Sequence, residues 1–230
     1  MYISSIVPGV EIVRDEFTIE LATSPDLIRE AYSLRNQVYC RERGYFADEA
    51  GLETDAFDPR SHHALLRANT TGDVVGTVRL IIATPDQPLD SFPMQHACRN
   101  LLPFVPMATT AEISRFAISK ARRSALSVPM MRLALMKGIL RLSLELKLTH
   151  WCAIMEPSLL RLLQATSIHF CPIGPLLDHH GLRQPCYNDI AAVMARLEDE
   201  QPVIWDFLTD CGILWPPAAI MAPMHLHAAA

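Results

Sequence analysis

The chain has 230 residues, of which 50% are hydrophobic and 20% are charged. This composition supplies enough apolar side chains for one large folded domain and excludes a disordered chain. The net charge of -5 and the lack of a basic tract exclude a typical nucleic-acid-binding surface, because phosphate binding needs clustered Lys and Arg.

Cysteine usage and the two ends of the sequence indicate a reduced, cytoplasmic protein. The six cysteines show no C-x-x-C spacing, so neither a disulfide framework nor a metal site is expected. Residues 1–13 lack the basic and apolar regions of a signal peptide. Residues 211–230 contain no Lys, Arg, Asp or Glu, but prolines interrupt them. We therefore expect one domain over residues 1–210 and an apolar arm over 211–230, which packs on the domain or a partner and is a candidate for peripheral membrane contact.

The predicted elements of the first half begin with a strand. Ser24 and Pro25 give an N-cap and a first helical residue, so a helix is expected from there to about Arg43. An acid-rich loop follows at 45–61. Two strands are expected at 63–68 and 74–83, after a first strand at 17–22. Residues 84–107 hold five prolines and are expected to form a long excursion, which in a compact domain is usually functional.

The second half alternates strands and helices. We expect strands at 110–119, 149–155 and 168–173, a loop at 174–188, and helices at 127–147, 157–165 and 189–208. The order predicts an α/β (α+β) fold, in which a mixed central β-sheet is flanked by helices.

Charged residues inside apolar strands mark a candidate site. Arg79 lies between Val78 and Leu80, and a second strand contains Glu112, Ser114 and Arg115. Charges in such strands need partners. Because strand side chains alternate, Glu112 and Ser114 are expected on one face and Arg115 on the other. The natural partners of Arg35, Arg79 and Arg115 are the acids of the 45–61 loop, namely Glu53, Asp55 and Asp58. The three arginines either order this loop or bind an acceptor carboxylate.

Four segments carry a family resemblance: R-x-x-V-[FY] from Arg35, E-x-D-x-[FY]-D from Glu53, G-x-x-R-L from Gly76, and [AE]-x-S-R-F from Glu112. In order and spacing they resemble the acyl-homoserine lactone synthases of the GNAT superfamily. Glu156-Pro157 and His180-Gly181-x-Arg183 make the chain still more similar to PEP-CTERM/exosortase-associated acyltransferases and long-chain N-acyl amino acid synthases. The resemblance covers about residues 17–185. It implies a GNAT fold, with acyl carrier protein as the acyl donor.

Two departures from the family pattern refine this expectation. Gly44-Tyr45-Phe46 stands where homoserine lactone synthases carry a Trp, which weakens the lactone assignment. Residues 120–125 lack the glycines with which coenzyme A-using relatives bind a diphosphate through backbone N–H groups. Acyl-phosphopantetheine of a carrier protein is therefore the expected co-substrate, and no other cofactor is expected. Lys120, Arg122 and Arg123 either dock the acidic carrier protein or form an ordinary solvated turn.

The expected reaction moves a long-chain acyl group from acyl carrier protein to the amine of an amino acid or similar small molecule. Glu112 is the candidate general base, with Ser114 beside it. The thioester is expected between strands 110–119 and 149–155, and the acyl chain against Met130, Met131, Leu133 and Leu135. His180 and Arg183 are expected to border the acceptor pocket. The alternatives are an S-adenosylmethionine-using autoinducer synthase and a non-catalytic GNAT module that binds an acyl ligand. The acceptor, acyl length and oligomeric state do not follow from the sequence.

Overall fold

The computed structural model of the protein describes residues 16–48, 50–86, 88–98, 105–122 and 128–215. Its helices and strands follow in chain order: β1 (Phe17–Leu21), α2 (Pro25–Arg35), a π-helix (Asn36–Glu42), a 3-10 turn (Asp58–Arg60), β2 (Ser61–Ala68), β3 (Val74–Ile82), a 3-10 turn (Pro88–Asp90), α3 (Pro93–Ala97), a 3-10 turn (Met107–Thr109), β4 (Thr110–Ile118), α4 (Val128–Glu145), β5 (His150–Met155), α5 (Pro157–Ala165), β6 (Cys171–Pro172), β7 (Leu177–Asp178), β8 (Leu182–Asp189), α6 (Ile190–Glu200) and α7 (Pro202–Thr209).

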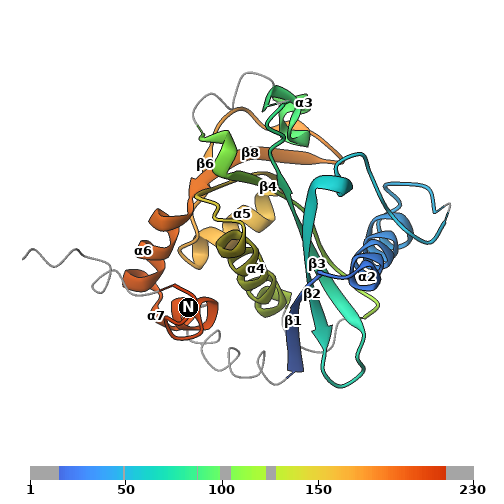
Figure 1. Ribbon diagram of the computed structural model, residues 1–230, viewed down its shortest axis with the longest axis horizontal. Coiled ribbons are helices and arrows are strands. Elements are labelled where there is room, and N and C mark those ends of the chain that lie inside the picture. The colour runs from blue at the N-terminus through green and yellow to red at the C-terminus, as the bar shows by residue number, and fades with distance from the viewer. Residues whose placement is uncertain (1–15, 49, 87, 99–104, 123–127, 216–230) are drawn as a thin grey trace, which may run out of the picture.

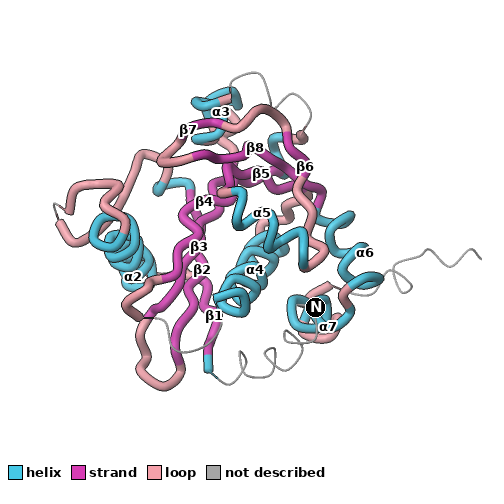
Figure 2. Tube along the Cα trace, turned by 180° about the vertical axis from the view of Figure 1, so that it is seen from behind, coloured by secondary structure: helices cyan, strands magenta, loops and turns pink. Residues whose placement is uncertain are grey.

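One sheet of eight strands organises the described chain. Its order is β1-β2-β3-β4-β5-β8-β6, and β7 pairs with β8. Strands β4 and β5 are parallel, whereas every other neighbouring pair is antiparallel. Helix α2 covers one face of the sheet, and α4 crosses the other face with α5, α6 and α7 around it (Figures 1 and 2). The predicted mixed sheet with flanking helices is confirmed.

Helix α4 is buried between the sheet and α7, and this position explains its nearly continuous apolar sequence. Residues from Met130 to Leu140 are buried almost without a break. Gly138 lets the helix approach β2 closely, since a Cβ at this residue would lie 2.7 Å from the Cβ of Ala64. The side chain of Lys137, the one basic residue in this stretch besides Arg132, pairs with Asp210.

The first helix begins as predicted and ends differently. The hydroxyl of Ser24 accepts a hydrogen bond from the backbone N–H of Leu27 at 3.3 Å, and Pro25 is the first helical residue. Beyond Arg35 the α-helix continues as a π-helix to Glu42, which was not predicted. Such π-helical turns are rare and often accompany functional sites.

In the C-terminal half, the structure differs from the predicted elements in three segments. The segment 174–188, expected to be a loop, contains β7 and most of β8. Strand β8 was missed because it is polar and carries Pro185, which has no N–H for the ladder. The strand expected at 168–173 is reduced to Cys171–Pro172. The helix expected at 189–208 is divided at Gln201, because the following Pro202 disfavours helical geometry at the residue before it.

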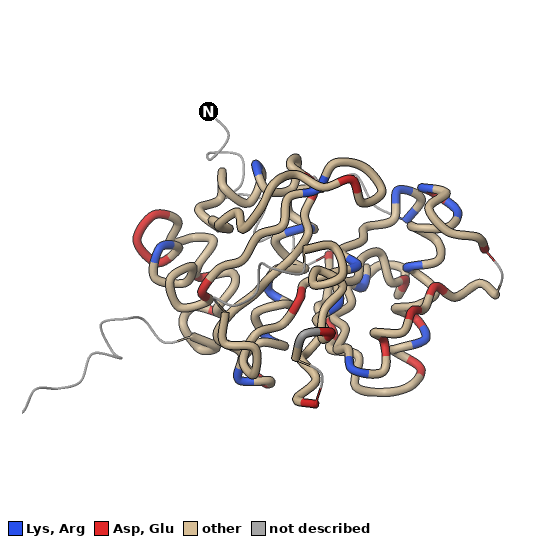
Figure 3. The backbone as a smooth tube through the Cα atoms, turned by 90° about the horizontal axis from the view of Figure 1, so that it is seen from above, with Lys and Arg blue, Asp and Glu red and all other residues tan. Residues whose placement is uncertain are grey.

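Two features concern the ends and the surface. Of the expected arm at 211–230 the structure describes only 211–215, where Trp215 packs against the hydrophobic core; residues 216–230 lie outside the described residues. Within the described residues, no helix is long and apolar enough to cross a membrane. Acidic and basic residues are interspersed along the trace, and in this view neither sign is gathered on one side (Figure 3).

Candidate active site

A closed ring of ion pairs joins α2, β3 and β4 to the loop between the π-helix and β2. Each of its three guanidinium groups contacts two carboxylates, and each carboxylate contacts two guanidinium groups. The members are Arg35, Arg79, Arg115, Glu53, Asp55 and Asp58. The shortest N–O distance in each pair lies between 2.5 Å, for Arg35 and Glu53, and 2.9 Å, for Arg115 and Asp55. The predicted pairing of these six residues is confirmed.

The ring is buried and neutral. Arg35 and Arg79 have no exposed side-chain surface, and the Asp58 side chain is 5% exposed. Burial alone would raise the pKa of the Asp58 carboxyl, but hydrogen bonds from Arg35 and the charges of Arg35 and Arg79 outweigh it and lower the pKa to about 2. Both arginines contact two carboxylates of the loop, although Nη2 of Arg79 is buried without a hydrogen-bond partner in the described chain. These contacts favour the loop-ordering role of Arg35 and Arg79 over binding of an acceptor carboxylate.

A bulge in β4 brings Ser114 and Arg115 to the same side. The register changes between Thr77, opposite Ala117, and Arg79, opposite Ser114, and Arg115 has a φ of +48°. The Ser114 hydroxyl therefore accepts a 2.9 Å hydrogen bond from Arg79, while the Arg115 guanidinium reaches Glu53 at 2.7 Å. The expectation that Ser114 and Arg115 face opposite ways is wrong, because one extra residue in a bulge interrupts the alternation of side chains.

Glu112 is a buried carboxyl group with a perturbed pKa. Its side chain projects from β4, is only 3% exposed, and accepts a 2.8 Å hydrogen bond at Oε2 from the backbone N–H of Met94. Burial raises its pKa to about 7, although the Met94 hydrogen bond and the charges of Arg79 and Arg115 act in the opposite direction. Met94 belongs to α3, so the long excursion predicted at 84–107 contacts the candidate base directly.

A cavity of about 260 Å³ lies where β4 and β5 separate. The two strands pair only from Thr110 opposite His150 to Ile113 opposite Ala153. Beyond this point Ser114, Arg115 and Phe116 face Ile154, Met155 and Glu156 across the cavity. Glu112 and Arg79 also line it. The gap between these strands is thus the cavity that the sequence predicted for the thioester, and the candidate base lies at its edge.

Helices α4 and α5 form one wall of this cavity. Their lining residues are Val128, Arg132, Met136, Leu159 and Leu163. The residues of α4 expected to line an acyl tunnel are buried in the core instead and do not line the cavity: Met130, Met131, Leu133 and Leu135. The choice was wrong because a helix nearly apolar all round gives no sequence signal for the face that meets the cavity.

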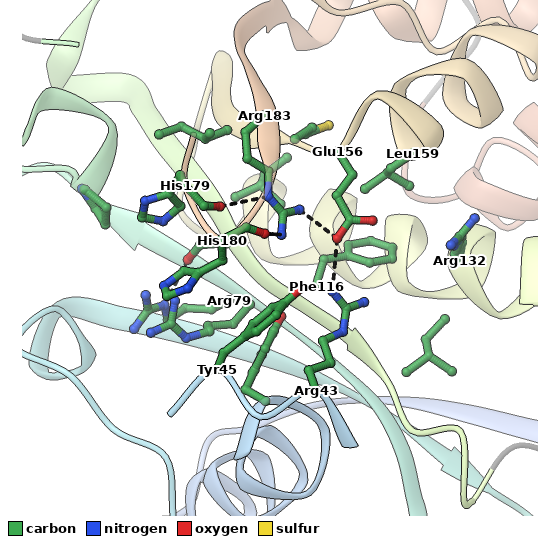
Figure 4. A pocket seen from close by; sticks show the side chains of 18 of the residues that line it. Arg43, Tyr45, Arg79, Phe116, Arg132, Glu156, Leu159, His179, His180 and Arg183 are labelled. Carbon is green, nitrogen blue, oxygen red and sulfur yellow. Dashed lines mark hydrogen bonds and ion pairs between the residues drawn. The ribbon is translucent and has the colours of Figure 1, made fainter. Parts of the chain in front are cut away.

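The cavity lining also contains an ion-pair bridge that the sequence did not predict. The Glu156 carboxylate forms ion pairs with Arg43 at 2.9 Å and with Arg183 at 2.7 Å (Figure 4). Arg183 also donates hydrogen bonds to the carbonyl oxygens of His179 and His180. The ring of His180 stacks on that of Tyr45, with 5.1 Å between the ring centroids. His180 and Arg183 both line the cavity, and their role toward an acceptor stays a prediction. Arg43 and Glu156 are 113 residues apart, so no local pattern reveals their contact.

The basic turn after β4 is divided between two surfaces. Lys120 lines the cavity, whereas Arg122 donates to the carbonyl of Val74 at 3.2 Å and lies beside Glu30 and Asp73. Arg123 lies outside the described residues. The three residues grouped by the sequence as one docking patch are therefore not brought together on one surface by the part of the turn that is described.

Metal binding and nucleophilic catalysis by His63 or Cys152 find no support among the described residues. In the described chain, no group of three or more His, Cys, Asp or Glu could hold a metal ion. Burial lowers the pKa of His63 to about 3 and raises that of the Cys152 thiol well above its usual value. A neutral imidazole and a protonated thiol do not form an activated nucleophile.

Residues 34–132 match the family model of the acetyltransferase (GNAT) domain. The acyl-homoserine lactone (AHL) synthase LasI is similar in structure, with 20% identity, a TM-score of 0.60 and coverage of 75% of this chain and 89% of LasI. The chain has the GNAT fold. FeeM, an N-acyl amino acid synthase from uncultured soil microbes, shares it with 18% identity, a TM-score of 0.57 and coverage of 80% of this chain and 96% of FeeM.

A third GNAT-fold structure is MesI, described as a CoA-dependent acyl-homoserine lactone synthase. It is 20% identical, with a TM-score of 0.59 and coverage of 84% of this chain and 94% of MesI. Among curated proteins none matches this sequence. The GNAT fold predicted from the four motif segments is thus confirmed, and residues 34–132 carry the match to the GNAT domain.

Proposed function

We propose that the protein is an N-acyltransferase, which moves a long-chain acyl group from acyl carrier protein to the amine of an amino acid or similar small molecule. One observation carries the proposal. Glu112 is a buried carboxyl group with a pKa near 7, at the edge of the cavity where β4 and β5 separate. A carboxylate with a pKa close to neutrality suits proton transfer at physiological pH.

The proposed chemistry is direct attack of the amine on the thioester carbonyl. The C–N bond forms, the C–S bond breaks, and the amine proton passes to Glu112 and then to the departing thiolate. Backbone N–H groups of β4 beyond Ile113, where pairing with β5 ends, are suitably placed to polarise the thioester oxygen. The buried, protonated Cys152 thiol beside Glu112 in the sheet supports a mechanism without a covalent enzyme intermediate.

The ion-pair bridge supports an acceptor that carries a carboxylate. Arg43 and Arg183 share the single carboxylate of Glu156, so the bridge has one positive charge in excess at the cavity. The ring arginines are already matched by Glu53, Asp55 and Asp58. An amino acid with its carboxylate near Arg43 and Arg183 would place its amine toward Glu112.

A second candidate reaction is synthesis of an acyl-homoserine lactone from S-adenosylmethionine. The structural likeness to LasI and MesI favours it. Tyr45-Phe46 stands where the family resemblance implies a Trp in homoserine lactone synthases, and this departure argues for the amino acid acceptor. MesI is described as CoA-dependent, so the fold is compatible with coenzyme A as the donor. Carrier protein is proposed as the donor because residues 120–125 contain no glycine.

The test is to incubate the protein with long-chain acyl carrier protein and each acceptor class, and to identify products by mass spectrometry. We expect N-acyl amino acid. Acyl-homoserine lactone formed only with S-adenosylmethionine would establish the second reaction. No product with any acceptor or with acyl-coenzyme A would favour a non-catalytic acyl-binding module.

A further inference from the structure

Arg132 is a half-buried cation at the cavity that has no ion-pair partner in the part of the chain that the structure describes. It projects from the first turns of α4 and lines the cavity beside Leu159 (Figure 4). Over the described residues, no hydrogen bond or ion pair involves its guanidinium group. The other cavity-lining arginines differ, because Arg79 and Arg115 each contact two carboxylates and Arg43 and Arg183 share Glu156.

The electrostatic surroundings of Arg132 disfavour its charged form. Burial lowers the pKa of Arg132, and the nearby charge of Arg43 adds to that effect, while Glu156 opposes it. Desolvating an unpaired charge is unfavourable. An anionic ligand at the cavity would remove this penalty.

Lys120 is an exposed cation that lines the same cavity, and Glu42 fixes the backbone that carries it. The Glu42 carboxylate accepts hydrogen bonds from the hydroxyl of Ser119 at 2.6 Å and from the backbone N–H groups of Lys120 at 2.9 Å and Ala121 at 3.3 Å. Loops between a strand and a helix often bind anions through such N–H groups. Here an internal carboxylate occupies them, so a ligand anion must be bound by side chains.

We propose that Arg132 and Lys120 bind the phosphate group at the end of the pantetheine arm of the acyl donor, with Glu42 as the positioning residue for Lys120. This inference rests on the proposed acyl-transfer function. Apolar lining residues, among them Val128, Met136 and Leu159, suit the arm between the phosphate and the thioester. A guanidinium and an ammonium group together match the charge and the acceptor oxygens of a phosphate.

The experiment removes the phosphate from the ligand and the guanidinium from the protein, first separately and then together. Dissociation constants for 4′-phosphopantetheine and for pantetheine, which lacks the phosphate, are measured by calorimetry with wild type, Arg132→Gln and Lys120→Gln. Arg161→Gln is the matched control, because Arg161 is exposed on α5 and does not line the cavity. Thermal melts check that each variant is folded.

We expect wild type and Arg161→Gln to bind 4′-phosphopantetheine at least about 10-fold more tightly than pantetheine, and Arg132→Gln to lose most of that preference. Equal preference in wild type and Arg132→Gln, or no preference in wild type, would overturn the proposal. Because binding is measured without an acceptor and without turnover, a failure of the proposed reaction would leave this result intact. Titrating coenzyme A and holo acyl carrier protein identifies which source of the phosphate loses affinity in Arg132→Gln; loss for neither would also overturn it.

Discussion

The backbone N–H of Met94 donates a 2.8 Å hydrogen bond to Oε2 of Glu112, and this contact joins the 84–107 excursion to the centre of the sheet. A single N–H donor supports the ionised carboxyl group without fully compensating its burial. The carboxyl group therefore remains near the midpoint of its titration at neutral pH, where small changes of environment alter its charge.

The first prediction concerns the pH dependence of stability. The pKa of Glu112 is raised from about 4.5 in the unfolded chain to about 7 in the folded protein. Between these values the folded state holds a proton that the unfolded state releases, so stability falls as pH rises through this window. The free energy of unfolding of wild type relative to Glu112→Gln should fall by at most about 3 kcal/mol from pH 4.5 to pH 8. Urea unfolding at several pH values measures it. A constant difference between the two proteins would show that Glu112 has an ordinary pKa.

The second prediction concerns the ion-pair ring. Arg115→Ala leaves Glu53, whose side chain is 6% exposed, with a reduced set of partners, and should cost on the order of 3–5 kcal/mol of stability. Arg115→Lys should rescue poorly, because an ammonium group cannot contact Glu53 and Asp55 as the planar guanidinium does.

The control for the ring is Arg41→Ala. Arg41 pairs with Asp48, but its side chain is 55% exposed, so the melting temperature should hardly change. If Arg115→Ala has the melting temperature of wild type but no activity, Arg115 acts on the substrate and does not order the loop.

The third prediction concerns the donor. Reversal of the basic turn with Arg122→Glu and Arg123→Glu should raise the apparent KM for acyl carrier protein and flatten its dependence on salt. The control is Arg196→Glu, on the exposed face of α6. Wild type that uses acyl-coenzyme A as efficiently as acyl carrier protein would contradict the proposed donor.

The fourth prediction concerns acceptor recognition. Arg43→Gln removes one of the two cations that share Glu156 and with it the excess positive charge of the bridge. The KM for an amino acid acceptor should rise by about 10-fold or more, whereas the KM for the corresponding amino acid amide should change little. Equal changes of KM for the amino acid and for its amide would show that Arg43 does not bind the carboxylate.

Much of the site could be predicted because it consists of charges inside apolar strands. Arg79, Glu112 and Arg115 stand out for that reason, and the nearby acids are their obvious partners. The same rule applied to α4 identifies Arg132, which interrupts the apolar run from Met130 to Leu133.

The remaining features depend on contacts that local sequence does not encode. Strand β8 is held by pairing with β5 and not by its own propensity, since it is polar and contains Pro185. The bulge at Arg115 breaks the alternation on which strand predictions rest. The bridge from Arg43 through Glu156 to Arg183 joins three distant segments, so it appears only once the sheet is assembled.

The most direct test of Glu112 as the base of acyl transfer is the pH profile of kcat in wild type and Glu112→Gln, with acyl carrier protein and an amino acid acceptor. Wild-type turnover should rise with pH through an apparent pKa near 7, since the ionised carboxylate is the active form. Glu112→Gln should melt like a folded protein, turn over about 100-fold or more slowly, and lack that ionisation. A folded Glu112→Gln protein with the wild-type rate and the same pH profile would contradict the central claim.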